Sequence, residues 1–434
     1  MESSTKTRIV FEGNAKSSKS AKCLNSCLQR GPNLIANLVG IWLRCRMKNI
    51  MLIADIKAAY VQLALNERDR DTVRFLWLKD VNKEVADNNI LELRFCRVIW
   101  GIVSAAFLLA FVLMLHLNKY NTPVSRDISS NLYVDNLISG EKTVAMATDY
   151  YHDTKKIFES AGMNMCKWSS NNDDVMMSIK EEDRCSDDIV KVLGTIWNRK
   201  LDTLSLCRFD YLNGTITKSF MLKVLSSVFD PPGLFAPVVL ELKLVLQEAW
   251  RANLEWDKRV PDEIAKQWTK KIRNFDGLHS IQINRCVANN VDEKAKYELV
   301  TFTDASIHAY AATVYLLEKV GNVITPSLVF CKSRLAPIKG DISIPRLELL
   351  GVVIGCRVSQ FVANHLRITA RRRLFTDSKC TIEWINSKKT LKKFVNERIK
   401  EIKSDKNVVV CYVAMLNLVR TLQILQLEDS QRRN

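Results

Sequence analysis

Two aspartates stand where predicted strands end, and their side chains could do chemistry together. Asp55 closes an apolar run that starts at Met51, and Asp135 lies in the tetrapeptide Tyr133-Val134-Asp135-Asn136, which has the form of a hairpin turn. Carboxylates that share a cleft can hold two divalent cations, and Mg2+ is the ion that favours oxygen ligands and few protein groups. Such ions lower the pKa of an attacking hydroxyl and stabilise a leaving phosphate, so the predicted chemistry is phosphoryl transfer.

Each of these motifs also has a purely structural interpretation. Asp55 could cap the short helix that follows it, and the tetrapeptide could be an ordinary β-hairpin turn. The residue after Asp135 is Asn136, whose amide is neutral. A carboxylate at this position would have given the metal ions a second negative charge. Neither motif decides between chemistry and structure by itself.

A second set of acids lies in the last third of the chain. Asp304 follows an apolar strand, Glu348 lies near the start of a long helix, and Asp377 ends another strand. Acids gathered at one end of a sheet repel one another unless cations neutralise them, and two Mg2+ ions there could activate a water molecule. Separately, the three could be a turn residue, a first-turn helix acid and an N-cap. Their order, Asp then Glu then Asp, favours a common site.

The sequence around these acids predicts the elements that position them. Residues 51–65 read as a strand that passes into a short helix, and the uncharged stretch 98–115 is predicted to be a buried helix rather than a membrane span. An amphipathic helix at 218–229, a stop at Asp230-Pro-Pro-Gly233 and a helix at 234–250 with Pro237 in its first turn follow. Residues 191–198 are predicted as one strand ending in a turn. Strands at 299–306, 310–317, 328–331 and 374–378 and a long helix from 344 are also predicted.

Composition sets the class of protein and its partners. The chain has 434 residues, 47% of them hydrophobic, which is enough for two or three domains. Its net charge of +17 and pI of about 9.3 favour a polyanionic partner, nucleic acid first. An anionic membrane surface and a merely solvated basic surface are the alternatives, but no basic amphipathic helix or lipidation signal is evident, and no membrane is expected as a partner.

The cysteines and the N-terminus indicate the compartment. Twelve cysteines are scattered without zinc-type spacing, as in reduced thiols of an intracellular protein. The first residues, Met-Glu-Ser-Ser-Thr-Lys, do not form a signal peptide. We therefore expect a cytoplasmic or nuclear protein that is not secreted.

Several segments, in order along the chain, resemble the polyprotein of BEL/Pao-type LTR retrotransposons, in its reverse transcriptase and RNase H region. The similarity runs almost end to end, and order and spacing make it specific although each piece is short. The segments are Thr7 to Phe11, Leu24 to Pro32, Asp55 to Gln62, Arg74 to Trp77, Arg97 to Gly101, Tyr133 to Asp135, Lys167 to Asn171, Phe229 to Pro237 and Glu255 to Asp257.

The resemblance implies an α/β (α+β) chain in four parts. They are truncated right-hand reverse-transcriptase fingers and palm at 1–175, a helical thumb and connection at 176–295, an RNase H-like mixed-sheet domain lacking its C-terminal end at 296–415, and an aberrant tail at 416–434. With only 54 residues before Asp55, part of the fingers is expected to be missing.

The same resemblance assigns roles to individual residues. Asp55 and Asp135 would be catalytic metal ligands of the palm, and Asp304, Glu348 and Asp377 those of the RNase H-like domain, with Mg2+ as cofactor and Mn2+ as an alternative. Substrate-binding residues would be Tyr60 as a gate against the ribose 2′-hydroxyl, Gly101 beside template and nucleotide, Lys167 near the incoming phosphates, and Arg8. Core packing and a turn are the alternatives for Tyr60 and Gly101.

Departures from the family pattern predict reduced or no activity. Asn136 replaces an aspartate, and Trp100, Ala105 and Ala106 replace smaller or Ser/Pro-containing positions. The fourth RNase H acid, expected after an asparagine such as Asn417, is absent. Residues 422–429 can be back-translated and read in a shifted frame as the missing ending, so the tail is hypothesised to be a frameshift, which the genomic DNA would decide.

Three interpretations follow from the sequence. The first is an impaired RNA-directed DNA polymerase and ribonuclease H that acts on RNA, DNA and RNA–DNA hybrid, and on nucleotide triphosphates if active. The second is a catalytically inactive nucleic-acid-binding remnant, and the third is a gene that makes no stable protein. No Asp-Thr-Gly or Asp-Ser-Gly loop supports aspartic proteolysis, and the oligomeric state is not indicated.

Overall fold

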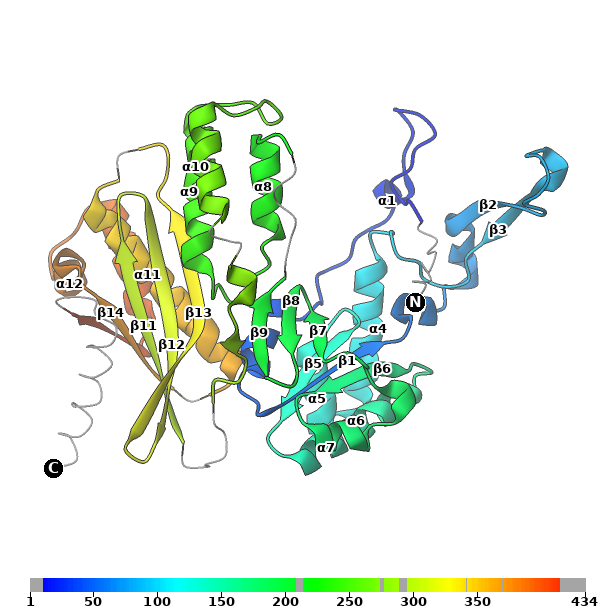
Figure 1. The fold of residues 1–434 in the computed structure, drawn as a ribbon, viewed down its shortest axis with the longest axis horizontal. Coiled ribbons are helices and arrows are strands. Elements are labelled where there is room, and N and C mark those ends of the chain that lie inside the picture. The colour runs from blue at the N-terminus through cyan, green and yellow to red at the C-terminus, as the bar shows by residue number, and fades with distance from the viewer. Residues whose placement is uncertain are drawn as a thin grey trace. The chain divides into compact units, whose positions relative to one another are not determined.

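The computed structural model describes residues 11–207, 214–273, 277–288, 295–340, 342–368 and 370–413. The chain forms two compact units (Figure 1). Unit 1 comprises Met1–Asn37 and Ile50–Ser186, and unit 2 comprises Leu38–Asn49 and Asp187–Asn434. The predicted roles of Arg8 and of the tail at 416–434 lie outside the described residues.

Unit 1 is built on a four-stranded antiparallel sheet in the order β4-β5-β1-β6. The strand predicted from Met51 and the predicted hairpin are both present. The strands are β1 (Ile50–Ile56), β4 (Leu132–Tyr133), β5 (Asn136–Glu141) and β6 (Met165–Ser170), and a separate hairpin joins β2 (Arg74–Leu78) to β3 (Ile90–Arg94).

Helices supply the rest of the unit 1 core. The helix expected within 98–115 begins only at Ala105, because residues 98–104 form a loop around Gly101, whose φ is +97°. Leu109, Leu113 and Leu117 recur every fourth residue and are buried, so this face of the helix packs on the core. The helix is apolar on its other faces as well, where Phe111, Val112 and Leu115 are exposed. The helices are α1 (Leu24–Cys27), α3 (Ala59–Gln62), α4 (Ala105–Tyr120), α5 (Pro123–Asn131), α6 (Val144–Glu159) and α7 (Asp173–Ser178), with 3₁₀ turns at Glu67–Val73, Asp87–Asn89 and Glu181–Asp183.

In unit 2 three helices form a small bundle: α8 (Lys218–Ser227), α9 (Ala236–Arg251) and α10 (Asp262–Arg273). Met221, Leu242 and Trp268 bring one residue from each helix into a shared core. The two predicted helices and the stop between them are confirmed, with Pro237 in the first turn of α9.

Unit 2 also contains a four-stranded antiparallel sheet in the order β10-β9-β8-β7. In sequence, β7, β8 and β9 come before the helical bundle and β10 comes after it. The prediction of a single strand at 191–198 was wrong, since β7 and β8 form a hairpin there. Leu193 and Gly194 both have positive φ, 46° and 88°, as a two-residue turn that matches the strand twist requires. The strands are β7 (Ile189–Val192), β8 (Thr195–Asn198), β9 (Thr203–Leu206) and β10 (Ile283–Asn284), and a 3₁₀ turn spans Leu278–Ser280.

The largest element of unit 2 is a five-stranded mixed sheet in the order β13-β12-β11-β14-β15, with helix α11 packed on β11 and β12 (Figure 1). β11 pairs antiparallel with β12 but parallel with β14, and β14 pairs parallel with β15. The four predicted strands and the long helix are confirmed. The elements are β11 (Lys296–Ala305), β12 (Ala309–Val320), β13 (Val323–Leu335), α11 (Ile344–Leu366), β14 (Arg371–Thr376), α12 (Lys379–Asn386), α13 (Lys393–Ser404) and β15 (Val408–Tyr412).

Among the described residues one helix is long and apolar enough to cross a membrane, α11, and 61% of its most apolar window is buried inside the protein. The apolar α4, where a membrane span was weighed, is a shorter helix.

Residues 38–49, called the strap below, belong to unit 2 although the chain on either side belongs to unit 1. The strap contains helix α2 (Leu38–Cys45), which packs on α11. Leu43 and Met47 enter the same hydrophobic cluster as Val314 of β12 and Val362 of α11. The strap is therefore part of the core under the mixed sheet.

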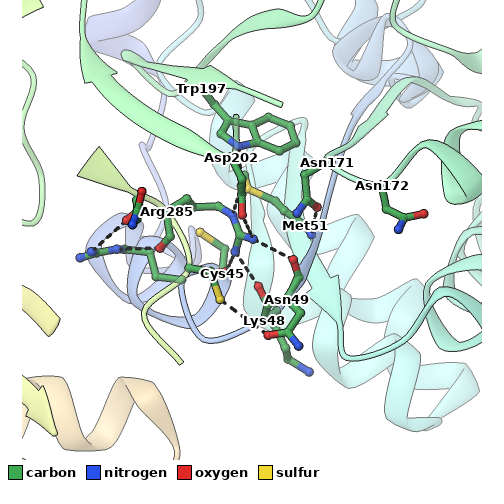
Figure 2. A network of polar contacts seen from close by, with 12 residues as sticks. Cys45, Lys48, Asn49, Met51, Asn171, Asn172, Trp197, Asp202 and Arg285 are labelled. Carbon is green, nitrogen blue, oxygen red and sulfur yellow. Dashed lines mark hydrogen bonds and ion pairs between the residues drawn. The ribbon is translucent and has the colours of Figure 1, made fainter. Parts of the chain in front are cut away.

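A buried arginine fixes the end of the strap (Figure 2). The side chain of Arg285 is fully buried, and it donates to the backbone carbonyls of Cys45, Lys48 and Asn49 at 2.6, 2.6 and 3.0 Å. It also donates to both carboxylate oxygens of Asp202, each at 2.6 Å. One guanidinium thus bonds the carbonyl of Cys45, the last residue of α2, and two carbonyls of the segment that follows the helix.

Candidate functional site

Asp55 and Asp135 come from neighbouring positions of the unit 1 sheet. Asp55 lies next to the end of β1 and pairs with Asn136, the first residue of β5. Asp135 lies in the turn between β4 and β5, where Val134 has a φ of 60°, and its carbonyl accepts from the amide of Ile56 at 2.9 Å. Burial raises the pKa of Asp135, and the negative charge of Asp55 raises it further. The structure thus brings these two predicted residues together.

Two nitrogen donors lie against this pair of carboxylates. Lys167 Nζ is 2.9 Å from Asp55 Oδ2, and this hydrogen bond raises the pKa of Lys167. Lys167 has a φ of 53°, in the segment where the register between β1 and β6 shifts. Asn136 Nδ2 donates to Asp135 Oδ1 at 2.9 Å. In this structure the lysine expected near incoming phosphates therefore neutralises Asp55.

Of the other predicted residues of unit 1, Tyr60 lies close to these carboxylates, whereas the neighbours of Gly101 include Phe11, Gly13 and Asn25. Tyr60 is in α3, four residues after β1, and its pKa is raised by burial and then by the charge of Asp135. Gly101 lies in the loop before α4. Asp55 does not cap α3, because Ala58 holds the N-cap position and no side chain bonds there.

Asp304 and Asp377 lie at the same end of adjacent parallel strands. Phe302 of β11 pairs with Phe375 of β14, and Thr303 Oγ1 donates to the Phe375 carbonyl at 3.2 Å. Two residues further along each strand the chain reaches the two aspartates. Burial raises the pKa of Asp304 and the charge of Asp377 raises it further, while a 2.7 Å hydrogen bond from the Ala305 amide opposes the shift.

Glu348 lies on α11, one turn before the residue at which this helix packs on the end of β11. It is the fifth residue of the helix, and a Cβ on Gly351, one turn later, would lie 3.4 Å from the Asp304 carbonyl oxygen, so this part of α11 packs on the end of β11. The charge of Glu348 is also among the causes that raise the pKa of Cys380 in α12, after burial and Glu383. Glu348 therefore acts electrostatically on the segment that follows Asp377.

The structural alternatives for these three acids are taken by other residues. Ser378, not Asp377, caps α12 by accepting from the Thr381 amide. Glu348 lies beyond the first turn of α11, which holds no acid. The turn after Asp304 is closed by Ser306, whose hydroxyl accepts from the His308 and Ala309 amides.

The donor set can be tested against the predicted metal. Within the ranges that the structure describes, no group of three or more His, Cys, Asp or Glu residues is placed to hold a metal ion. Each site instead offers a pair of interacting carboxylates, and the pKa of Asp135 and of Asp304 is raised first by burial and further by the neighbouring carboxylate, both of which a bound cation would offset. Oxygen donors of this kind fit Mg2+, which binds through one or two carboxylates and keeps several waters.

Sequence reasoning gave no role to three features that the structure brings out. These are the Arg285 network, the strap, and a side-chain clamp made by Asn25. Asn25 lies in a segment that carried the family resemblance, but its bonds reach residues more than 70 positions away, and no local pattern predicts them.

Comparison with known proteins agrees with this geometry. Residues 217–378 match the model of the Pao retrotransposon-like RNaseH-like domain, which confirms the predicted BEL/Pao resemblance. No curated protein matches the chain.

Three solved structures of the foamy viral protease-reverse transcriptase resemble the chain. The complex with RNA/DNA hybrid is 11% identical with a TM-score of 0.54, and the match covers 88% of this chain and 46% of that one. The dRH form with ds DNA is 12% identical with a TM-score of 0.57, covering 90% and 61%, and the complex with dsDNA is 12% identical with a TM-score of 0.52, covering 90% and 72%. The chain thus spans about half the length of the first. At these identities the likeness shows the fold alone, and it confirms the predicted reverse transcriptase and RNase H architecture.

Proposed function

We propose that the chain is a retrotransposon-derived polypeptide that binds RNA, DNA and RNA–DNA hybrid, and that its RNase H-like site retains phosphoryl-transfer chemistry of reduced efficiency. The observation that carries the proposal is the position of Asp304 and Asp377 at the same end of two adjacent parallel strands, where the charge of Asp377 acts on Asp304. Glu348 comes from α11, the helix that packs on the end of β11. None of the three serves as a helix cap, so their charges are available for another role.

Asp304 and Asp377 would hold Mg2+, and Glu348 would add charge from α11. When bound, the metal would supply charge neutralisation and a more acidic water. The chain's own contribution is to fix the carboxylates on rigid elements, since Asp304 lies in β11 and Asp377 directly after β14. A carboxylate pair held in this way repels anions, which is why a phosphodiester approaches only together with cations.

The proposal assigns weaker chemistry to the Asp55 and Asp135 pair. Lys167 already compensates Asp55, and Asn136 donates to Asp135 instead of adding a charge. DNA synthesis would therefore be lost before hybrid cleavage.

Cleavage of a labelled RNA–DNA hybrid by the full chain tests this function. With Mg2+ the wild-type chain should cut the RNA strand, and Asp304→Asn and Asp377→Asn should each lower the rate at least tenfold. Glu383→Gln is the matched control, an exposed acid in α12 that also acts on Cys380. Cleavage that survives both aspartate substitutions would exclude this site as its source.

A second candidate function is nucleic-acid binding without catalysis. It is favoured by the nitrogen donors at Asp55 and Asp135 and by the net charge of +17. This second function would be supported if the wild-type chain binds the hybrid but neither cleaves it nor extends a primer in Mg2+ or Mn2+.

A further inference from the structure

The side chain of Asn25 holds the loop that precedes α4 at two points. Its Oδ1 accepts from the Val103 amide at 2.8 Å, and its Nδ2 donates to the Gly101 carbonyl at 3.0 Å. Nδ2 also donates to Asn14 Oδ1 at 3.0 Å, and the Asn25 amide donates to the Gly13 carbonyl at 3.0 Å. The Asn25 side chain therefore ties Asn14 to residues 101–103, and its backbone amide adds the bond to Gly13.

Two glycines allow the backbones to come this close. Gly101 has a φ of +97°, and a Cβ there would lie 2.3 Å from the Phe11 carbonyl oxygen. A Cβ on Gly13 would lie 2.8 Å from the Gly101 carbonyl oxygen. Since any side chain at either place would force the segments apart, the clamp depends on a close contact between backbones.

Trp100 is the residue that this arrangement presents to solvent. Ile99 and Ile102 are 5% and 8% exposed, whereas Trp100 between them is 42% exposed. The segment is also anchored on its other side, because the Val98 amide donates to the Leu63 carbonyl at 2.9 Å, just after α3. An indole held between two buried isoleucines on a doubly anchored loop is a rigid aromatic surface.

The clamping segment is basic. From residue 11 to residue 34 it carries the exposed cations Lys16, Lys19, Lys22 and Arg30, against the single acid Glu12. Exposed aromatic rings accompanied by cations are the combination that binds single-stranded nucleic acid, because bases stack on the ring while the cations meet the phosphates.

We propose that Asn25 is a positioning residue, which fixes the loop 100–103 so that Trp100 stacks on an unpaired base of a bound strand. The inference rests on the proposed nucleic-acid binding and adds to it the element that takes the unpaired strand. Asn25 acts through Trp100 and does not itself contact the base.

A double-mutant cycle on the full chain tests the proposal. The probe is a fluorescein-labelled RNA–DNA duplex with a single-stranded overhang, and its blunt counterpart is the control ligand. Trp100→Ala should weaken binding of the overhang duplex roughly five- to a hundredfold, the range that follows from the energy of one stacked base. Asn25→Ala should produce a similar loss, and in the Trp100→Ala background it should produce no further loss. Blunt-duplex binding should be unchanged throughout.

Asn14→Ala serves as the matched control, since it removes the third hydrogen bond of the clamp and keeps both bonds to the loop. It should leave overhang binding within twofold of wild type. Amide exchange at Val103 should accelerate in Asn25→Ala and not in Asn14→Ala.

The outcomes separate this inference from the function on which it rests. Additive losses for Asn25→Ala and Trp100→Ala, or equal binding of overhang and blunt duplex by the wild-type chain, would overturn the inference alone. A wild-type chain that binds neither duplex would refute the proposed function and this inference with it.

Discussion

Arg285 is a cation without solvent contact, and its replacement should cost more than that of any surface arginine. Arg285→Met would remove both guanidinium bonds to the Asp202 carboxylate, which would keep the bond from the Trp197 indole, and it would take one donor from each of three backbone carbonyls. Breaking a buried pair on one side costs about 3–5 kcal/mol. Arg285→Lys should be nearly as damaging, because one ammonium cannot reproduce a planar fork of donors. Urea unfolding of the full chain measures both.

The matched control is the exposed Arg259, which pairs with Asp262 at 2.9 Å while both side chains are more than 70% exposed. Arg259→Met should change the free energy of unfolding by less than about 1 kcal/mol. Equal losses for the two arginines would show that the buried network does not stabilise the fold.

At the residue scale, sequence could predict acids whose positions follow from strand ends. Asp304 and Asp377 each stand where an apolar run stops, and parallel strands place such ends together. Arg285 could not be predicted in this way, because three of its acceptors are backbone carbonyls 236 to 240 positions away. Backbone acceptors carry no residue type, so no pattern of side chains signals them. The placement of Lys167 on Asp55 likewise depends on a shift in strand register that the sequence does not reveal.

At the element scale, the strap should stabilise unit 2 and not the sheet of unit 1. Leu43 is 1% exposed and packs in the cluster that includes Val314 and Val362, so Leu43→Ala should cost about 2–5 kcal/mol. Amide exchange should accelerate in α11, β11 and β12, while β1 and β5 keep their protection. The control is Leu109→Ala in α4, which removes a fully buried side chain from the unit 1 core. It should accelerate amide exchange in β1 and β5 and leave α11, β11 and β12 protected. For Leu43→Ala, faster exchange in β1 with unchanged α11 would contradict the assignment of the strap to unit 2.

The contact between α2 and α11 should also weaken in acid. Arg44 NH1 lies 3.2 Å from His365 Nδ1, so the arginine donates to a neutral imidazole. Burial and the positive charges of Arg44 and Arg367 lower the pKa of His365 below its ordinary value near 6.5. The unfolded chain then takes up the proton first as the pH falls, and stability declines from about pH 7 down to the folded-state pKa. Urea midpoints measured between pH 8 and pH 5.5 follow this decline, and it should be smaller in His365→Gln than in the wild-type chain. Equal declines in the two chains would contradict the role of His365.

Helices and strands could be predicted where their apolar residues recur with a single regular spacing. Helix α8 and the strands of the mixed sheet follow from apolar spacing, but β11, β12 and β13 each extend beyond the predicted ranges because flanking polar residues also pair in the ladder. The hairpin of β7 and β8 was not predicted because its turn contains Leu193. Leu193 has a positive φ, which leucine rarely adopts, so the sequence does not indicate a turn there.

At the scale of the whole molecule, the order of motifs along the chain predicted the architecture and the match at 217–378 agrees with it. What the order could not predict is that residues 38–49 leave the unit to which their neighbours belong. Membership of a unit is decided by which core accepts Leu43 and Met47, and both are apolar residues that would suit either core. Long-range choices of this kind depend on the packed structure and not on local pattern.

The net charge of +17 belongs to the molecule as a whole, and it makes a prediction that no single site does. Binding of any duplex should fall linearly with salt on logarithmic axes, because each neutralised phosphate releases counterions. If about six phosphates are neutralised, affinity should drop roughly 10³-fold between 50 and 200 mM salt. Anisotropy titrations at four salt concentrations give the slope. Asp377→Asn should leave the slope unchanged, since one carboxylate near the site contributes no released counterion, whereas charge reversal at Lys16 and Lys19 should make it shallower by about two. A slope near zero for the wild-type chain would mean that its basic surface does not meet phosphates, and the excess of Lys and Arg would then be only a solvated surface.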